Sequence, residues 1–317
     1  MTRVFLFLFL LGALSPSLRS QVSIRQQLND LIALEKEGHF DQAIRSVRIL
    51  IDGNNLGGEA GRAWTILGFA HQQLGHFQQA RKAYEQALHI LEKDAPHRIE
   101  YASALINFAN LNNITQGPEI ATRLWRKALK VHTELGNHPG MAEDYAFLAG
   151  SELEKKHRRA GKKYLDQAIA EAKLIENPTN DQAIFLSDTQ GWKANVEGDG
   201  KSELAAYQHS LELRQNRQRE DSPTTGQAYL YVGIAYADCR EWEQAVAKMR
   251  QGLEILDRVV GHDTPPYLAG EVLLAKVLDQ EGMRDEASQV RKRAMWAARE
   301  LFRGDCAGCT FSVASLR

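Results

Sequence analysis

Small residues recur through this chain of 317 residues at a nearly constant spacing. Gly68 lies in the stretch WTILGFAHQQLGHFQQARKAYEQAL and has a small counterpart in each of five later segments. These counterparts are Ala109, Ala149, Gly191, Gly233 and Ala275, at successive spacings of 41, 40, 42, 42 and 42 residues. A constant period in this range predicts an array of stacked structural repeats.

Three further positions repeat with the same period. The position of Ala87 is always small, that of Ala80 is small except at Glu203, and that of Tyr84 is mostly large. Two helices can pack at short distance only where one of them lacks a large side chain, and a bulky side chain then fills the adjoining gap. The members of these three sets are Ala128, Ala168, Ser210, Gly252 and Ala294; Ala121, Gly161, Glu203, Ala245 and Ala287; and Trp125, Leu165, Tyr207, Met249 and Arg291.

A seventh copy precedes the others in the stretch EGHFDQAIRSV, although Leu31 stands where Gly68 would be. Glycines such as Gly38, Gly75 and Gly282 fall where a first helix must end and turn. Prolines fall between units, where they can begin a helix without breaking one. The predicted units lie near 24–57, 61–99, 102–137, 142–177, 184–219, 226–260 and 268–301, within a repeat domain of residues 21–303.

The chain resembles the tetratricopeptide repeat (TPR) family over about residues 24–301. Trp64, Leu67, Gly68, Ala80 and Tyr84 fit its pattern W-x2-L-G…A-x3-F/Y. The resemblance implies an all-α fold, a right-handed α-solenoid of about seven helix pairs. The usual repeat has 34 residues, whereas the spacing near 42 is similar to that of the repeats in kinesin light chains.

In this family the first helix of each unit lines a concave surface that binds extended peptides or helices. The resemblance places thirteen residues of this chain in that groove. Their amide, aromatic and apolar groups suit a peptide, although several of them could equally pack between repeats. The groove residues are Phe69, Gln72, Gln73, Ile106, Asn110, Asn113, Asp188, Trp192, Asn195, Ile234, Asp238, Lys276 and Asp279.

Composition and motifs favour protein binding over other functions. Lys plus Arg number 39 and Asp plus Glu number 40, so the net charge gives no reason to expect a nucleic acid partner. The sequence has no HExxH, no G-x-S-x-G and no glycine-rich phosphate loop. We therefore expect a non-enzymatic scaffold that has no cofactor and binds a protein or peptide; the sequence leaves the oligomeric state open.

The first residues, MTRVFLFLFLLGALSPSLRSQ, have a basic start, an uncharged apolar run and then small residues. This order is typical of a secretory signal peptide, which we place at residues 1–20. The apolar run is too short to span a bilayer, which takes roughly 20 residues. We expect an exported protein, periplasmic or secreted, without stable membrane insertion after cleavage.

The C-terminal tail, residues 304–317, contains Cys306 and Cys309 two residues apart. In an exported protein this pair could form a small disulfide, take part in thiol exchange or supply half of a metal site. No second pair of Cys or His residues completes a zinc site. The alternative to a scaffold is therefore an accessory redox or metal-binding factor that uses these two cysteines.

Overall fold

The computed structural model describes residues 16–53, 56–94, 99–216 and 221–303, and within these ranges the chain is helical. Short turns connect the helices, and one single-turn 3-10 helix, η1 (Gly57–Glu59), precedes α4. The α-helices are α2 (Pro16–Lys36), α3 (Phe40–Asp52), α4 (Ala60–Gln73), α5 (Phe77–Asp94), α6 (Ile99–Thr115), α7 (Pro118–Glu134), α8 (His138–Glu154), α9 (Arg158–Lys173), α10 (Asn180–Glu197), α11 (Gly200–Gln215), α12 (Pro223–Asp238), α13 (Trp242–Val260), α14 (Pro265–Glu281) and α15 (Arg284–Arg303).

The helices form seven consecutive pairs, from α2/α3 to α14/α15. Within each pair the two helices pack against each other, and the second helix of a pair packs against the first helix of the next. The prediction of an all-α array of helix pairs is therefore confirmed. The first helices begin a few residues before the predicted starts of the units, at Pro16, Ala60, Ile99, His138, Asn180, Pro223 and Pro265.

The repeated small residues are the points of closest approach within a pair. A Cβ atom added at Gly68 would lie 2.6 Å from ring atoms of Tyr84, and one added at Gly191 would lie 2.7 Å from the ring of Tyr207. Real Cβ atoms do not approach other atoms so closely, so each glycine leaves the space that the tyrosine occupies. The large side chain is 16 residues after the small one in both pairs, as the repeat pattern predicts.

Glycine and proline mark the helix ends. Gly38, Gly75 and Gly282 each follow a first helix and have φ values of +87°, +77° and +97°, a region that side chains with a Cβ atom rarely adopt. Pro223 and Pro265 are the first residues of α12 and α14, where a missing N–H group costs no hydrogen bond.

The predicted signal peptide is only partly within the described ranges. Residues 1–15 lie outside them, and Pro16 to Ser20 form the beginning of α2. None of the helices in the described ranges is long and apolar enough to cross a bilayer. Export remains a prediction.

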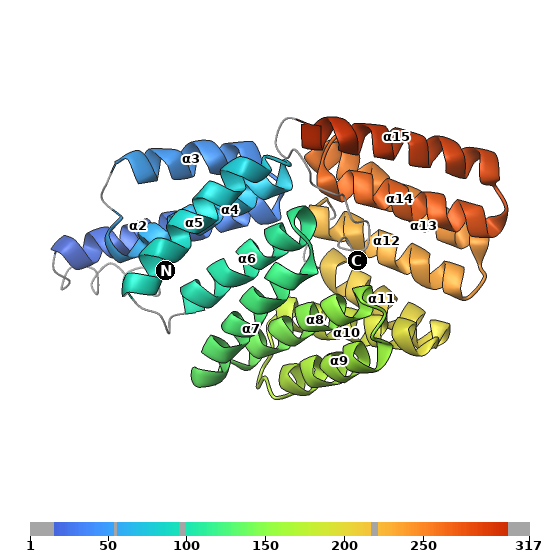
Figure 1. The fold of residues 1–317 in the computed structure, drawn as a ribbon, viewed down its shortest axis with the longest axis horizontal. Helices are drawn as coiled ribbons and strands as arrows, with labels where there is room; N and C mark the ends of the chain where they lie inside the picture. Colours follow the sequence, from blue (N-terminus) through green and yellow to red (C-terminus); the bar gives the residue numbers. More distant parts are fainter. Residues whose placement is uncertain (1–15, 54–55, 95–98, 217–220, 304–317) are drawn as a thin grey trace, which may run out of the picture.

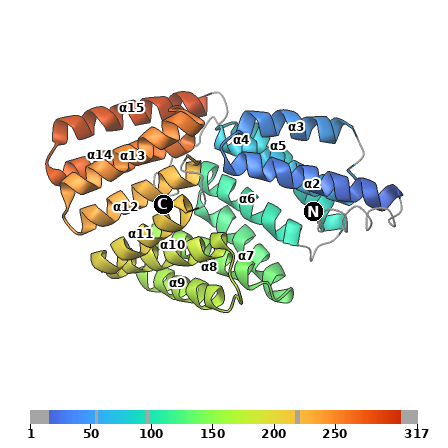
Figure 2. The ribbon, with the colours of Figure 1, turned by 180° about the vertical axis from the view of Figure 1, so that it is seen from behind.

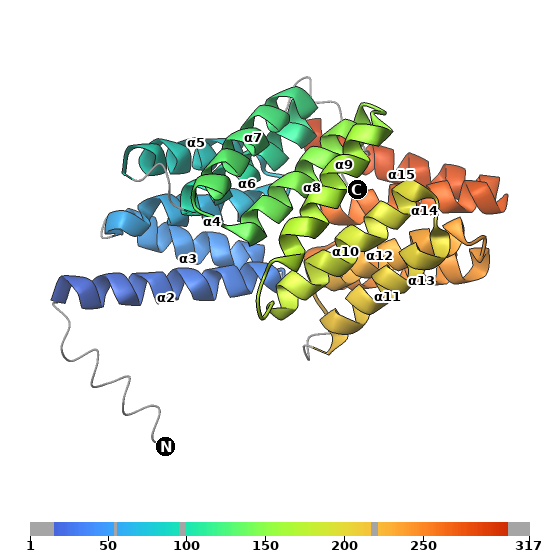
Figure 3. The ribbon, with the colours of Figure 1, turned by 90° about the horizontal axis from the view of Figure 1, so that it is seen from below.

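The two ends of the helical array contact each other. Figure 1 shows α2–α5 in blue and α14–α15 in red at the upper side, with the middle helices below them, and Figure 2 shows the same arrangement from behind. In Figure 3 the helices α8–α11 cross the opposite side. A Cβ atom added at Gly75 would lie 2.6 Å from Leu301, and Lys36 of α2 forms an ion pair with Asp181 of α10 at 3.1 Å. The solenoid therefore curves far enough for its first two repeats to meet its last ones.

Glu203 is the exception among the small residues, and its side chain is buried with 1% exposure. The amide of Asn195 donates to both carboxylate oxygens of Glu203, at 3.1 and 3.2 Å, and to Asp238 at 2.7 Å. Burial, followed by the nearby Asp238 carboxylate, raises the pKa of Glu203 to about 8. A carboxyl group thus replaces the usual alanine because an amide from the preceding helix binds it.

We predict that Gly68→Ala lowers the free energy of unfolding in the wild type and raises it in a Tyr84→Leu variant. In the wild type the new methyl group meets the Tyr84 ring, and overpacking of this kind costs about 1–3 kcal/mol. In a Tyr84→Leu background, which imitates the Ala149 and Leu165 pair, only the gain of about 1 kcal/mol in helix propensity remains. Chemical denaturation of the four proteins should give a coupling free energy of about 1–3 kcal/mol. An equal effect of Gly68→Ala in both backgrounds would contradict this packing.

We also predict that Glu203 makes the protein less stable as the pH rises from about 5 to about 8. In this range the folded protein retains the Glu203 proton, whereas the unfolded chain, with the ordinary pKa of 4.5, releases it. The free energy of unfolding then falls by up to about 1.4 kcal/mol per pH unit. Glu203→Gln should remove this part of the pH dependence in denaturation curves. The exposed Glu212 provides the control, since Glu212→Gln should leave the dependence as in the wild type.

Candidate functional site

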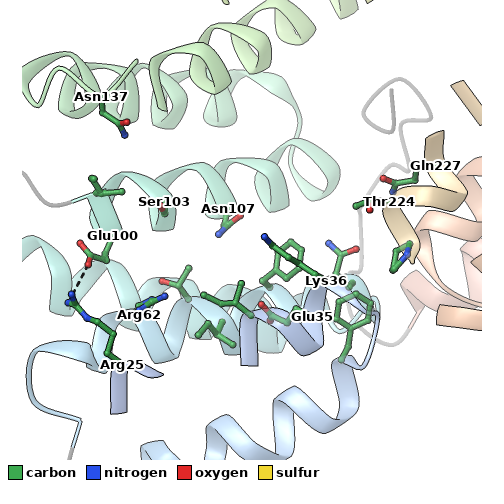
Figure 4. Close-up of a pocket in the computed structure, with 18 of the residues that line it drawn as sticks. Arg25, Glu35, Lys36, Arg62, Glu100, Ser103, Asn107, Asn137, Thr224 and Gln227 are labelled. Carbon is green, nitrogen blue, oxygen red and sulfur yellow. Dashed lines mark ion pairs between the residues drawn. The ribbon is translucent and has the colours of Figure 1, made fainter. Parts of the chain in front are cut away.

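A cavity of about 1110 Å³ lies between the first helices of the early repeats and α12. It is at the large end of the range of small-molecule sites, which is roughly 300–1,000 Å³. Helices α2, α4, α6 and α12 supply most of its walls, and Figure 4 shows their side chains around it. The lining residues are Arg25, Ile32, Glu35, Lys36, Phe40, Arg62, Thr65, Ile66, Phe69, Gln73, Ile99, Glu100, Ser103, Asn107, Leu135, Asn137, Pro223, Thr224 and Gln227.

One face of α4 forms the central wall of the cavity. Its lining residues Arg62, Thr65, Ile66, Phe69 and Gln73 are spaced by three or four residues, so they lie in one stripe along the helix. The Phe69 ring packs edge-on against Phe40 of α3, with ring centroids 6.3 Å apart. This contact holds the aromatic ring in the wall while part of it remains exposed.

The cavity uses one repeat position that the groove prediction omitted. Arg62 lies six residues before Gly68, and the equivalent positions in three other repeats also line the cavity. Those residues are Arg25, Ser103 and Gln227. The position is two helical turns before Phe69, on the same face, which explains why both face the cavity.

The three cationic side chains of the lining already have acidic neighbours. Arg25 contacts Glu59 at 2.6 Å and Glu100 at 4.0 Å, the second of which is the dashed pair in Figure 4. Arg62 lies 3.8 Å from Glu59, and Lys36 lies 3.1 Å from Asp181. Each positive charge at the cavity is therefore compensated within the protein.

Glu35 differs from the other charged residues of the lining. Its side chain is 7% exposed, and its buried Oε1 atom has no hydrogen-bond partner among the described residues. Burial raises the pKa of Glu35 well above its usual value. Figure 4 shows Glu35 beside Lys36 on α2, with Asn107 of α6 opposite them.

Neutral polar side chains complete the lining. Gln73, Ser103, Asn107 and Gln227 are half-buried, and within the described ranges none of these four side chains forms a hydrogen bond to the protein. Amide groups can both donate and accept, so three of the four could pair with a peptide backbone in either direction. Together with Phe69, Ile32 and Ile66 they give the cavity a mixed apolar and amide surface.

Two of the thirteen predicted groove residues, Phe69 and Gln73, line the cavity. Gln72 points the other way: it is buried and accepts a hydrogen bond from the Tyr84 hydroxyl at 3.0 Å. Ile106 is also buried, in the core around α6. On α4 the stripe that faces the cavity therefore leaves out Gln72, whereas in the first repeat the equivalent residue, Glu35, lines the cavity.

The predicted groove residues of repeats three and five contact neighbouring helices. The Trp125 indole donates to Asn110 at 3.1 Å, and Asn113 hydrogen-bonds Glu154. Asp188 accepts from Arg214 at 2.7 Å, and Trp192 packs against the core of repeat four. Each of these side chains has an interaction within the array, outside the cavity lining.

The remaining predicted residues lie further along the array. Asn195 binds Asp238 and Glu203, as described above, and Ile234 packs against the C-terminal core. Lys276 and Asp279 are exposed on α14, where Asp279 forms an ion pair with Arg291. A role for any of these residues in binding remains a prediction.

Glu35 and its neighbours could have been found from the repeat pattern. Leu31 corresponds to Gly68, so Ile32, Glu35 and Lys36 correspond to Phe69, Gln72 and Gln73. The groove prediction started from repeat two and omitted the first repeat. Extending the same register by one unit places all three residues near the groove.

The predicted cysteine pair lies outside the described residues, as Cys306 and Cys309 both follow residue 303. The described ranges contain no group of three or more His, Cys, Asp or Glu side chains arranged to hold a metal ion. The disulfide, redox and metal-site hypotheses for the two cysteines therefore remain predictions.

Residues 61–94 match the family model described as Tetratricopeptide repeat, which covers α4 and α5. No curated protein matches the sequence. Among solved structures, the chain is similar to the Rap conjugation gene regulator of plasmid pLS20 in complex with the Phr* peptide, at 14% identity and a TM-score of 0.65. That alignment covers 89% of this chain and 75% of the other.

Two further structures have the same arrangement of helices. NprR in complex with its cognate peptide NprX aligns with a TM-score of 0.61 and 10% identity, covering 89% of this chain and 80% of the other. A Rap protein complexed with Competence and Sporulation Factor gives 0.56 and 14%, covering 89% and 99%. At these identities the likeness concerns the fold. With the matched repeat and the seven stacked helix pairs of the described residues, it shows an all-α solenoid of tetratricopeptide-like helix pairs.

Proposed function

We propose that this protein is a non-catalytic scaffold that binds a short peptide, or an exposed segment of a protein, in the cavity between α2, α4, α6 and α12. The observation that carries the proposal is the composition of the cavity. One concave surface combines a half-buried aromatic ring, Phe69, with amide side chains that form no hydrogen bonds to the described residues. Such a surface can pair with a peptide backbone and hold an apolar side chain.

The structural neighbours support this proposal. The Rap regulator of pLS20 and NprR are both peptide complexes. These proteins have the same fold at low sequence identity, so the likeness supports a peptide as the class of ligand and says nothing of its sequence.

The contact between the two ends of the solenoid also favours binding. Residues of the first three repeats and of α12 line one cavity because the two ends of the array contact each other. A site formed by packed helices is already ordered before the ligand arrives, which lowers the entropic cost of binding. The signal-like sequence of residues 1–20 leads us to propose that the ligand is encountered outside the cytoplasm.

A direct test is fluorescence binding of a library of labelled pentapeptides with capped ends to the purified chain. We predict that the wild type binds a subset of the library and that Phe69→Ala weakens binding about tenfold or more, as expected for an aromatic anchor. Asn107→Phe should have a similar effect because it fills the cavity from α6 and breaks no hydrogen bond within the protein.

Glu212→Gln serves as the control, since Glu212 is exposed on α11, lies outside the cavity lining and is not among the predicted groove residues. Circular dichroism checks that each variant is folded, because Phe69 also packs against Phe40. The proposal is wrong if the wild type binds no member of the library. It is also wrong if both cavity variants bind as the wild type does.

A further inference from the structure

The cavity contains a carboxyl group that has no cationic partner among the described residues. Glu35 lies in the last turn of α2, it is 7% exposed, and its Oε1 atom has no hydrogen-bond partner in the described part of the chain. A buried polar atom left without a partner costs about 1–3 kcal/mol, and more when the group is charged. Such a group in a native protein calls for an explanation, and functional sites are one of the places where it occurs.

The cationic side chains of the cavity lining are bound to other carboxylates. Lys36, the next residue, extends to Asp181 of α10, with 3.1 Å between Nζ and Oδ2. Arg25 and Arg62 both contact Glu59, on the far side of the lining. Among the described residues, every ionisable group of the lining except Glu35 therefore has an oppositely charged neighbour.

The polar groups around Glu35 have other partners or are not bonded to it. Burial, followed by the nearby Glu35 carboxyl group, raises the pKa of the Tyr84 hydroxyl on α5, and this hydroxyl donates to Gln72. The neutral lining amides are half-buried and do not bond to Glu35. A donor supplied by a ligand can therefore pair with this carboxyl group, and a cationic donor forms the stronger bond.

We infer that the peptide bound in this cavity carries a lysine or arginine side chain whose cationic group pairs with Glu35. This inference rests on the proposed function and specifies the ligand. The apolar stem of such a side chain would run along Phe69 and Ile32, and its charged end would meet the buried carboxylate. A charge-assisted hydrogen bond in a site of low exposure is about twice as strong as a neutral one.

The test compares two libraries of capped pentapeptides that differ at the central residue, which is lysine in one and the uncharged norleucine in the other. We expect the wild type to bind the lysine library about tenfold or more tightly. Glu35→Gln should remove this preference and leave the binding of norleucine peptides unchanged. Glu35→Asp, which keeps the carboxylate, should retain part of the preference.

Glu100→Gln is the matched control, because Glu100 also lines the cavity but already faces Arg25. The preference of this variant for lysine peptides should stay as in the wild type.

In the absence of peptide, Glu35→Gln should be as stable as the wild type or more stable at pH 7, since it removes a carboxyl group that is costly to ionise. Equal binding of both libraries by the wild type would overturn the inference while leaving peptide binding intact. A marked loss of stability in Glu35→Gln would also overturn it and assign Glu35 to the structure. Binding of neither library would instead contradict the proposed function.

Discussion

The close contact between a small residue on the first helix and a large residue on the second determines how this molecule is built. At Gly68 and Tyr84, and again at Gly191 and Tyr207, the ring fills the space where a Cβ atom would be. Because a contact of this kind recurs along the array, again at Gly233 and Met249, these pairs have similar shapes and stack with a similar rotation. The curvature of the array is the sum of these small, nearly equal rotations between successive helix pairs.

That curvature brings together parts of the chain that are far apart in sequence. Residues of α2 and α12 line the same cavity, and Gly38 packs against Val259 and Pro223. The contact between the two ends then fixes the geometry of the cavity, since neither end can move without losing packed surface. A binding site of this kind belongs to the whole array, and no single repeat contains it.

Two buried carboxyl groups of the array, those of Glu203 and Glu35, differ in their hydrogen-bond partners. Glu203 replaces a small residue and is bound by the amide of Asn195, so it acts as part of the packing between α10 and α11. Glu35 faces the cavity and has an oxygen atom without a partner. The first is satisfied by the protein itself, whereas we assign the second to the ligand.

The repeat period, the positions of close helix contact and the glycine turns were determined by the sequence, because each depends on residues within about 40 positions of one another. The all-α fold and the seven helix pairs follow from these local patterns. The contact between the ends and the site it creates do not, since a small change in rotation per repeat, summed over the array, moves the ends by a large distance. Phe69, which was predicted to face a groove, lines the cavity because its helix face is fixed by the repeat. The pairing of Trp192, Asp188 and Asn195 with neighbouring helices, and the isolation of Glu35, were decided only by tertiary packing.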